Sequence, residues 1–173
     1  MSDASRIPVL LKGGARTPIG RFLGGLSHFS APQLGAIAVR AAVGRSGIDV
    51  RDVEEVIMGN VVTAGAGQAP ARQAAVGGGV PETVPALTIN KVCGSGLKAV
   101  MLAAQAIRAG DARLIVAGGM ESMSMVPHYL RGMRNGIKFG DQTIDDGLIF
   151  DGLWCSFGSC HMGGYAEYTA NKA

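Results

Sequence analysis

Short apolar runs alternate with helix-like segments along the chain up to residue 119. The runs at residues 7–14, 54–62, 84–90 and 113–119 are rich in Val, Ile and Leu, and each predicts a buried strand. Between them, small and apolar residues recur at helical spacing near residues 31–46, 69–79 and 95–109. Strands that alternate with helices indicate a layered α/β fold, with helices on both faces of a central mixed, partly parallel sheet.

Two of the predicted helices carry clear end signals. Ser30 is an expected N-cap, Pro32 lies in the first turn, and Gly47 ends that helix. The segment from Ser95 to Ala109 repeats apolar residues every three or four positions and ends at a Gly-Asp turn. These signals predict two well-defined helices, the second of which follows directly after an apolar strand.

The periodic pattern stops after Gly119. The following residues contain methionines, glycines and scattered charges but no repeat of useful length. A compact domain rarely carries so long an irregular loop unless the loop has a function. We therefore expect an α/β domain over residues 1–118 and an irregular, extended or partly ordered second region over residues 119–173.

Composition narrows the class of protein. Hydrophobic residues make up 47% of the chain and charged residues 17%, which argues against disorder. The net charge is only +3 and no Lys/Arg run is present, so we expect no nucleic-acid partner. No apolar stretch approaches the roughly 18 residues of a membrane helix. Three cysteines without a disulfide framework, and an N-terminus that does not resemble a signal sequence, favour a cytoplasmic protein with reduced thiols.

The sequence "NKVCGSGLKAV" places Cys93 between a predicted strand and a predicted helix. A helix N-terminus presents unpaired N–H groups and a partial positive charge, which stabilise a thiolate. The adjacent glycines remove side-chain bulk and would let a substrate carbonyl approach the sulfur. This arrangement suits a nucleophile that accepts an acyl group, although a small buried thiol in a strand-to-helix turn would give the same spacing.

Several motifs in the same order resemble the first half of the thiolase family. They are "ARTPIGRF", "GNVVTAGAGQAPARQAA", "NKVCGSGLKAV", "AGDARLIVAGGMESMS" and "HMGGYAEYTANKA". The resemblance implies an acetyl-CoA C-acetyltransferase in which Cys93 takes the acyl group from a CoA thioester and passes it on. It implies that His161 and Met162 line the pantetheine and acyl end of the pocket, and that Gly94 and Gly96 shape the floor under the thioester. CoA or acyl-CoA would be a substrate, no cofactor or metal is implied, and the irregular region would begin the family's loop domain.

The family's second half is not represented in this sequence. It supplies a histidine in a "GHP" motif, a cysteine in a "CxGGG" motif and an "NEAFA" segment, and none of these occurs here. His28, His128 and His161 lie in other contexts, so we expect the isolated chain to be inactive or very slow. The resemblance also implies that the sheet lacks its last strand. We therefore expect a homodimer or larger homo-oligomer, or a complementary C-terminal thiolase chain.

Other interpretations remain open at this point. A ketoacyl-carrier-protein synthase would share the fold. A truncated thiolase, or half of a two-chain enzyme, would share the motifs. A non-catalytic assembly module would keep the dimer-forming surface and lack the chemistry. Cys155, Cys160 and His161 match no common zinc spacing, although the two cysteines could pair under oxidation. The "GAGQAP" segment carries a proline in the place of the third glycine of a dinucleotide fingerprint.

Overall fold

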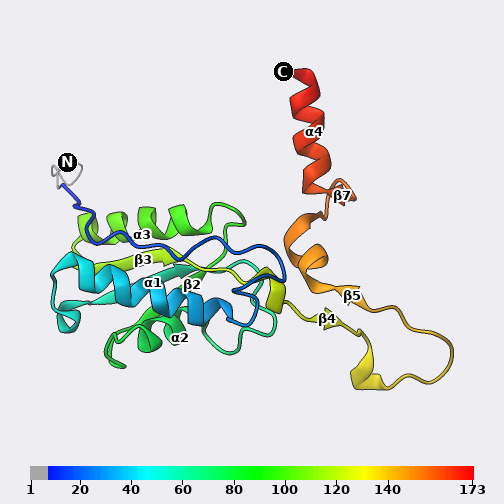
Figure 1. Ribbon diagram of the computed structural model, residues 1–173, viewed down its shortest axis with the longest axis horizontal. Helices are drawn as coiled ribbons and strands as arrows, with labels where there is room; N and C mark the ends of the chain where they lie inside the picture. Colours follow the sequence, from blue (N-terminus) through cyan, green and yellow to red (C-terminus); the bar gives the residue numbers. More distant parts are fainter. Residues whose placement is uncertain (1–7) are drawn as a thin grey trace. The chain divides into compact units, whose positions relative to one another are not determined.

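A computed structural model describes residues 8–173, which form two compact units, residues 8–125 and residues 126–173. The first unit is a layered α/β structure (Figure 1). The second is built from short hairpins and helices. The domain boundary expected at residues 118–119 stays a prediction. In the described part of the chain, no helix is both long enough and apolar enough to cross a membrane.

A three-stranded sheet forms the centre of the first unit. Its strands are β1 (Glu55–Gly59), β2 (Ala86–Ile89) and β3 (Ile115–Gly119), in the order β2-β1-β3. Both pairings are parallel, so the carboxyl ends of all three strands meet at one edge. The predicted layered α/β fold is confirmed; the sheet, expected to be mixed and partly parallel, has only parallel pairings among the described residues.

Helices cover both faces of this sheet, as expected. Side chains alternate along a strand, so Val56 and Met58 of β1 pack in one cluster with residues of α1 (Ala31–Ser46) and α2 (Pro70–Gly77). Ile57 points to the opposite face and packs against Ala99 and Ala103 of α3 (Ser95–Ala109). Figure 1 shows α3 along one side of the sheet and α1 and α2 along the other.

The predicted helix ends are confirmed. Ser30 caps α1 through a reciprocal capping box with Gln33, and Gly47 closes the helix at a φ of 68°. The helix α3 begins at Ser95 and ends at Ala109, followed by Gly110 at a φ of 85°. These ends agree with the sequence because local capping groups set them.

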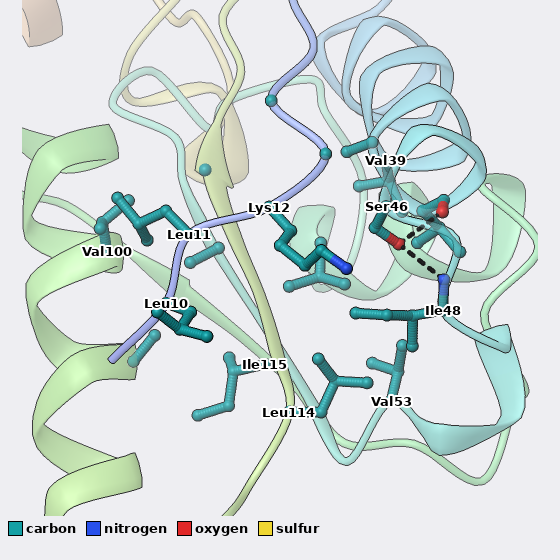
Figure 2. Close-up of a pocket in the computed structure, with 18 of the residues that line it drawn as sticks. Leu10, Leu11, Lys12, Val39, Ser46, Ile48, Val53, Val100, Leu114 and Ile115 are labelled. Carbon is teal, nitrogen blue, oxygen red and sulfur yellow. Dashed lines mark hydrogen bonds between the residues drawn. The ribbon is translucent and has the colours of Figure 1, made fainter. Parts of the chain in front are cut away.

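The prediction of a strand over residues 7–14 is wrong for residues 8–14, which the structure describes. Ile7 lies outside the described residues, and Pro8–Gly14 contains no strand. This segment runs beside β3 without pairing to it (Figure 2). An apolar composition suits a strand, but strand formation also requires a hydrogen-bonded neighbour. Among the described residues, the outer edge of β3 therefore has no strand partner.

The second unit contains more regular structure than the sequence suggested. Two short antiparallel pairs form, β4 (His128–Tyr129) with β5 (Asp145–Asp146), and β6 (Trp154–Cys155) with β7 (Cys160–His161). A π-helical turn spans Ile149–Leu153, and α4 spans Met162–Lys172. The region expected to be irregular, extended or partly ordered thus contains an unforeseen helix, α4, whose two early glycines and missing side-chain cap hide the helical signal. Short 3₁₀ turns occupy Val50–Asp52, Met123–Met125 and Met133–Asn135.

Candidate functional site

Cys93 lies at the carboxyl edge of the sheet, between the end of β2 at Ile89 and the start of α3 at Ser95. Its side chain is exposed. In open parallel α/β sheets, ligands bind outside the carboxyl ends of the strands. The structure thus places the predicted thiol at the strand-to-helix junction, on the edge where a binding site is expected.

Hydrogen bonds within residues 90–95 fix the turn that carries Cys93. The Asn90 side-chain oxygen accepts from the Val92 N–H at 2.9 Å, and the Gly94 N–H donates to the Lys91 carbonyl at 3.1 Å. The Ser95 hydroxyl donates to the Val92 carbonyl at 2.6 Å and accepts from the Lys91 N–H at 2.8 Å. Ser95 is buried, so its hydroxyl stabilises the turn through hydrogen bonds on the side that faces the protein interior.

Val92, directly before Cys93, has an unfavourable backbone conformation. Its φ is 47°, in the left-handed region that β-branched residues rarely adopt. An L-residue there costs about 1–2 kcal/mol, and such conformations persist only where surrounding contacts over-determine them. The bonds from Asn90 and Ser95 supply those contacts, and the turn presents Cys93 to solvent as a result.

Glycines let the N-terminus of α3 approach the strand ends. A Cβ atom added to Gly59 would lie 2.6 Å from the Cβ of Ser95 and 2.9 Å from the Gly96 nitrogen. A Cβ atom on Gly119 would lie 3.1 Å from the Gly96 Cα. Glycine at the ends of β1 and β3 is therefore required for the helix to start where it does.

The N-terminus of α3 has no side-chain cap. Gly94 occupies the N-cap position and offers no side-chain acceptor to the first-turn N–H groups. Such groups are available to an anion or a developing negative charge. Among residues 8–173, the Cys93 thiol has no hydrogen-bonding side chain beside it that could act as a base. The arrangement offers a nucleophile and backbone donors, and the base would have to come from elsewhere.

A partly buried polar network joins the ends of the strands. The Glu121 carboxylate accepts from the Asn60 side-chain amide at 2.7 Å and from the N–H groups of Val61 and Val62 at 2.9 and 3.3 Å. Burial raises the pKa of Glu121, although these donors oppose that shift. The Asn90 side-chain amide donates to the Val61 carbonyl at 3.2 Å. The network therefore connects the end of β1 to residues that follow β2 and β3.

The sequence alone did not place these polar residues at the site. Asn60 and Asn90 each come directly after an apolar strand, and Glu121 follows β3 after one further residue. Because the strands are parallel, their carboxyl ends had to meet at one edge. A polar residue at or near the carboxyl end of each predicted strand was the signal that could have identified them.

His161 and Met162 belong to the second unit. His161 is the N-cap residue of α4, and its ring lies edge-on to Trp154 with ring centroids 5.2 Å apart. Met162 begins the helix and is exposed. The structure thus brings Cys93, Gly94 and Gly96 together at one junction, and joins His161 to Met162 in a separate unit.

A cavity of about 550 Å³ lies elsewhere in the first unit (Figure 2). Residues 8–15, β3, α1 and α3 line it, and Cys93 does not. Figure 2 shows Leu11 near Val100 of α3, while Leu10 and Leu11 remain 81% and 79% exposed overall. The cavity lies beside β3, and Cys93 is not among the residues that line it.

Comparisons with known proteins agree on one family. Residues 9–173 match the family model described as the thiolase N-terminal domain. An acetyl-CoA acetyltransferase of Cupriavidus necator is 55% identical over 164 residues, which make up 95% of this chain and 42% of that protein. "Acetyl-CoA acetyltransferase ERG10, cytosolic" of Gibberella zeae is 57% identical over 160 residues, 92% of this chain and 40% of that protein. Acetyl-CoA acetyltransferase 2 of Arabidopsis thaliana is 52% identical over 164 residues, 95% of this chain and 41% of that protein. The chain therefore spans less than half the length of these relatives.

Proposed function

The chain belongs to the thiolase family, and we propose that it is the N-terminal part of an acetyl-CoA C-acetyltransferase that works through an acyl-cysteine at Cys93. The names of the similar proteins support the reaction class. The observation that carries the proposal is the exposed thiol of Cys93. It lies in a turn with a strained backbone at Val92, directly before a helix whose N-terminus has no side-chain cap.

In the proposed reaction, the Cys93 thiolate attacks the thioester carbonyl of an acyl-CoA. The new carbon–sulfur bond forms at Cys93, and the CoA thiolate leaves and takes up a proton. N–H groups in the first turn of α3 would stabilise the charge that develops near the carbonyl. Gly94 and Gly96 would leave room under the thioester, and His161 and Met162 would line the pantetheine and acyl end. CoA and its thioesters are substrates in this scheme, and no cofactor or metal takes part.

The described residues lack one part of this machinery. No hydrogen-bonding base contacts the Cys93 thiol within residues 8–173. General-base assistance is worth about 10²- to 10⁴-fold. We therefore expect slow acylation of this chain alone and no efficient turnover. A cytoplasmic location is in keeping with the name of the Gibberella zeae relative, which describes that protein as cytosolic.

The exposed apolar surface of the first unit supports a protein partner. Leu97 and Met101 lie one turn apart on α3 and are 69% and 49% exposed. Leu10 and Leu11 lie beside the edge of β3 that has no strand partner within residues 8–173, and such an edge readily recruits another chain. A second copy of the chain or a complementary C-terminal chain would cover these surfaces. The same observation fits a non-catalytic assembly module, which would bind a partner but carry no acyl group.

Intact-mass analysis after mixing the chain with acetyl-CoA distinguishes these functions. Trypsin cuts after Lys91 and Lys98, so residues 92–98 isolate Cys93 in one peptide. We expect an acetyl group on this peptide, absent in Cys93→Ala and retained in Cys155→Ala. No acetyl adduct with or without a complementary half, or an adduct on another cysteine, would rule out the proposed nucleophile and favour the assembly module.

A further inference from the structure

The hairpin formed by β6 and β7 places two cysteines opposite each other. The antiparallel register pairs Cys155 with Cys160 and Trp154 with His161. Facing residues of an antiparallel pair have Cα atoms about 4.5 or 5.5 Å apart, and side chains of such a pair lie on the same face. Both separations fall within the range of about 4.4–6.8 Å that a disulfide spans. The backbone therefore already has a geometry that a Cys155–Cys160 bond can use.

Tyr165 of α4 lies against the turn of the same hairpin. Its phenol, in the first turn of α4, is influenced first by Cys155 and then by Cys160, which together raise the pKa of Tyr165 to about 12. A Cβ atom on Gly158 would lie 1.7 Å from the Tyr165 hydroxyl oxygen, so glycine leaves the space that the phenol occupies. The phenol of Tyr165 thus lies against the hairpin turn beside Gly158, the residue whose N–H is bonded to the Cys155 sulfur.

The hairpin also favours attack by one of the two thiols. The Gly158 N–H donates to the Cys155 sulfur at 3.3 Å. This bond, the Phe157 N–H and the Tyr165 hydroxyl lower the pKa of Cys155. Both cysteines are only partly buried, and Phe157 at the tip of the hairpin is fully exposed. A small disulfide in solution can therefore reach Cys155.

We propose that Cys155 and Cys160 form a dithiol–disulfide site that exchanges with low-molecular-weight disulfides such as oxidised glutathione. The Cys155 thiolate attacks one glutathione sulfur, a mixed disulfide forms, and the first glutathione leaves as a thiolate that takes up a proton. Cys160 then loses its proton to solvent and attacks the Cys155 sulfur. The second glutathione leaves, so two protein thiols are oxidised while one glutathione disulfide is reduced to two thiols. An excess of reduced glutathione reverses both steps.

This site is independent of the proposed acyl transfer. Its residues all lie in the second unit, and its chemistry does not use Cys93. Pairing of cysteines is uncommon in a reducing compartment except where it is transient or redox-sensing. A hairpin that holds both thiols ready suits such a transient bond.

Redox titration in glutathione buffers, followed by acid quenching and alkylation with N-ethylmaleimide, tests the proposal. Trypsin leaves Cys155 and Cys160 together in the peptide of residues 139–172, and Cys93 alone in the peptide of residues 92–98. We expect the larger peptide to lose two hydrogens and resist alkylation as the buffer becomes oxidising. The Cys160→Ser variant should stop at a glutathione adduct on Cys155.

Two tyrosine variants separate this mechanism from simple exposure of the thiols. Tyr165→Phe should slow the first exchange several-fold, because the Cys155 thiolate loses a hydrogen bond. Tyr168→Phe, on the same helix and 59% exposed, is the matched control and should leave the rate unchanged. Stable glutathione adducts on both cysteines, a bond from either cysteine to Cys93, or no oxidation in a fully oxidised buffer would each overturn the proposal.

Discussion

Replacing Ser95 by alanine tests whether the turn at Cys93 is held from inside the protein. The hydroxyl makes two hydrogen bonds, at 2.6 Å to the Val92 carbonyl and at 2.8 Å from the Lys91 N–H. A typical hydrogen bond contributes about 0.5–1.5 kcal/mol net, so the pair contributes about 1–3 kcal/mol. Lys91 is exposed, which lets water replace one of these bonds and places the expected loss at about 1–2 kcal/mol.

Because Val92 is strained, the stability lost in Ser95→Ala should appear mainly as local opening of the turn. The turn stores about 1–2 kcal/mol because Val92 has a positive φ. Without the Ser95 hydroxyl, the turn can open and release that strain. We therefore expect the backbone amides of residues 90–97 to exchange with solvent about 5- to 30-fold faster, which corresponds to about 1–2 kcal/mol.

Ser46 provides a matched control in the same unit. Its hydroxyl also donates to the carbonyl three residues earlier, Val43, at 2.6 Å, and accepts from the Ile48 N–H at 3.1 Å (Figure 2). Ser46→Ala should lower the free energy of unfolding in urea by a similar amount but leave exchange over residues 90–97 unchanged. If both variants accelerate exchange there equally, or Ser95→Ala has no local effect, the turn is not fastened by Ser95.

Three further outcomes are expected. Gly59→Ala should destabilise the chain by about 1–3 kcal/mol in urea unfolding, because the new Cβ overlaps Ser95. Gly44→Ala, on the open face of α1, is the control and should be neutral or stabilising by up to about 1 kcal/mol. Equal losses in the two variants would contradict the close approach at Gly59. Burial raises the pKa of the Glu121 carboxyl above its usual 4.5, so the folded state keeps the proton to a higher pH than the unfolded state does. The unfolding free energy of wild type minus that of Glu121→Gln should therefore fall as the pH rises above about 4.5. A difference that rises with pH would show the opposite shift. Light scattering at micromolar concentration should show a dimer or larger species, and a monomer that persists on concentration with a cooperative thermal transition would show that the apolar faces need no partner.

The sequence predicted the elements whose determinants are local. The helix α3 has the expected ends because its apolar residues keep a helical period and Gly110 provides a left-handed cap. The helix α1 follows its Ser30 cap and Gly47 in the same way. The central strands are shorter than the apolar runs that predicted them, because pairing ends where a parallel neighbour ends.

The sequence failed where the outcome depends on distant residues. Residues 8–14 have the composition of a strand, but β3 pairs only with β1 among the described residues. The helix α4 has two glycines in its first turn and no side-chain cap, so its helical pattern is weak in the sequence. The roles of Cys93, Gly94, Gly96, His161 and Met162 stay predictions, because a role in a reaction requires a substrate as well as a position.

The turn at Cys93 shows why a site can be located from sequence before its geometry can be known. An apolar run, a Gly-Ser-Gly segment and a helical repeat place the cysteine at a junction, and all of these are local signals. Nothing local predicts a positive φ at Val92, because valine disfavours it. The structure offsets that cost with a buried hydroxyl at Ser95 and with glycines at the ends of two strands, which bring α3 against the sheet. The small residues around Cys93 therefore act together: removing any one should loosen the turn while leaving the fold that the sequence predicts.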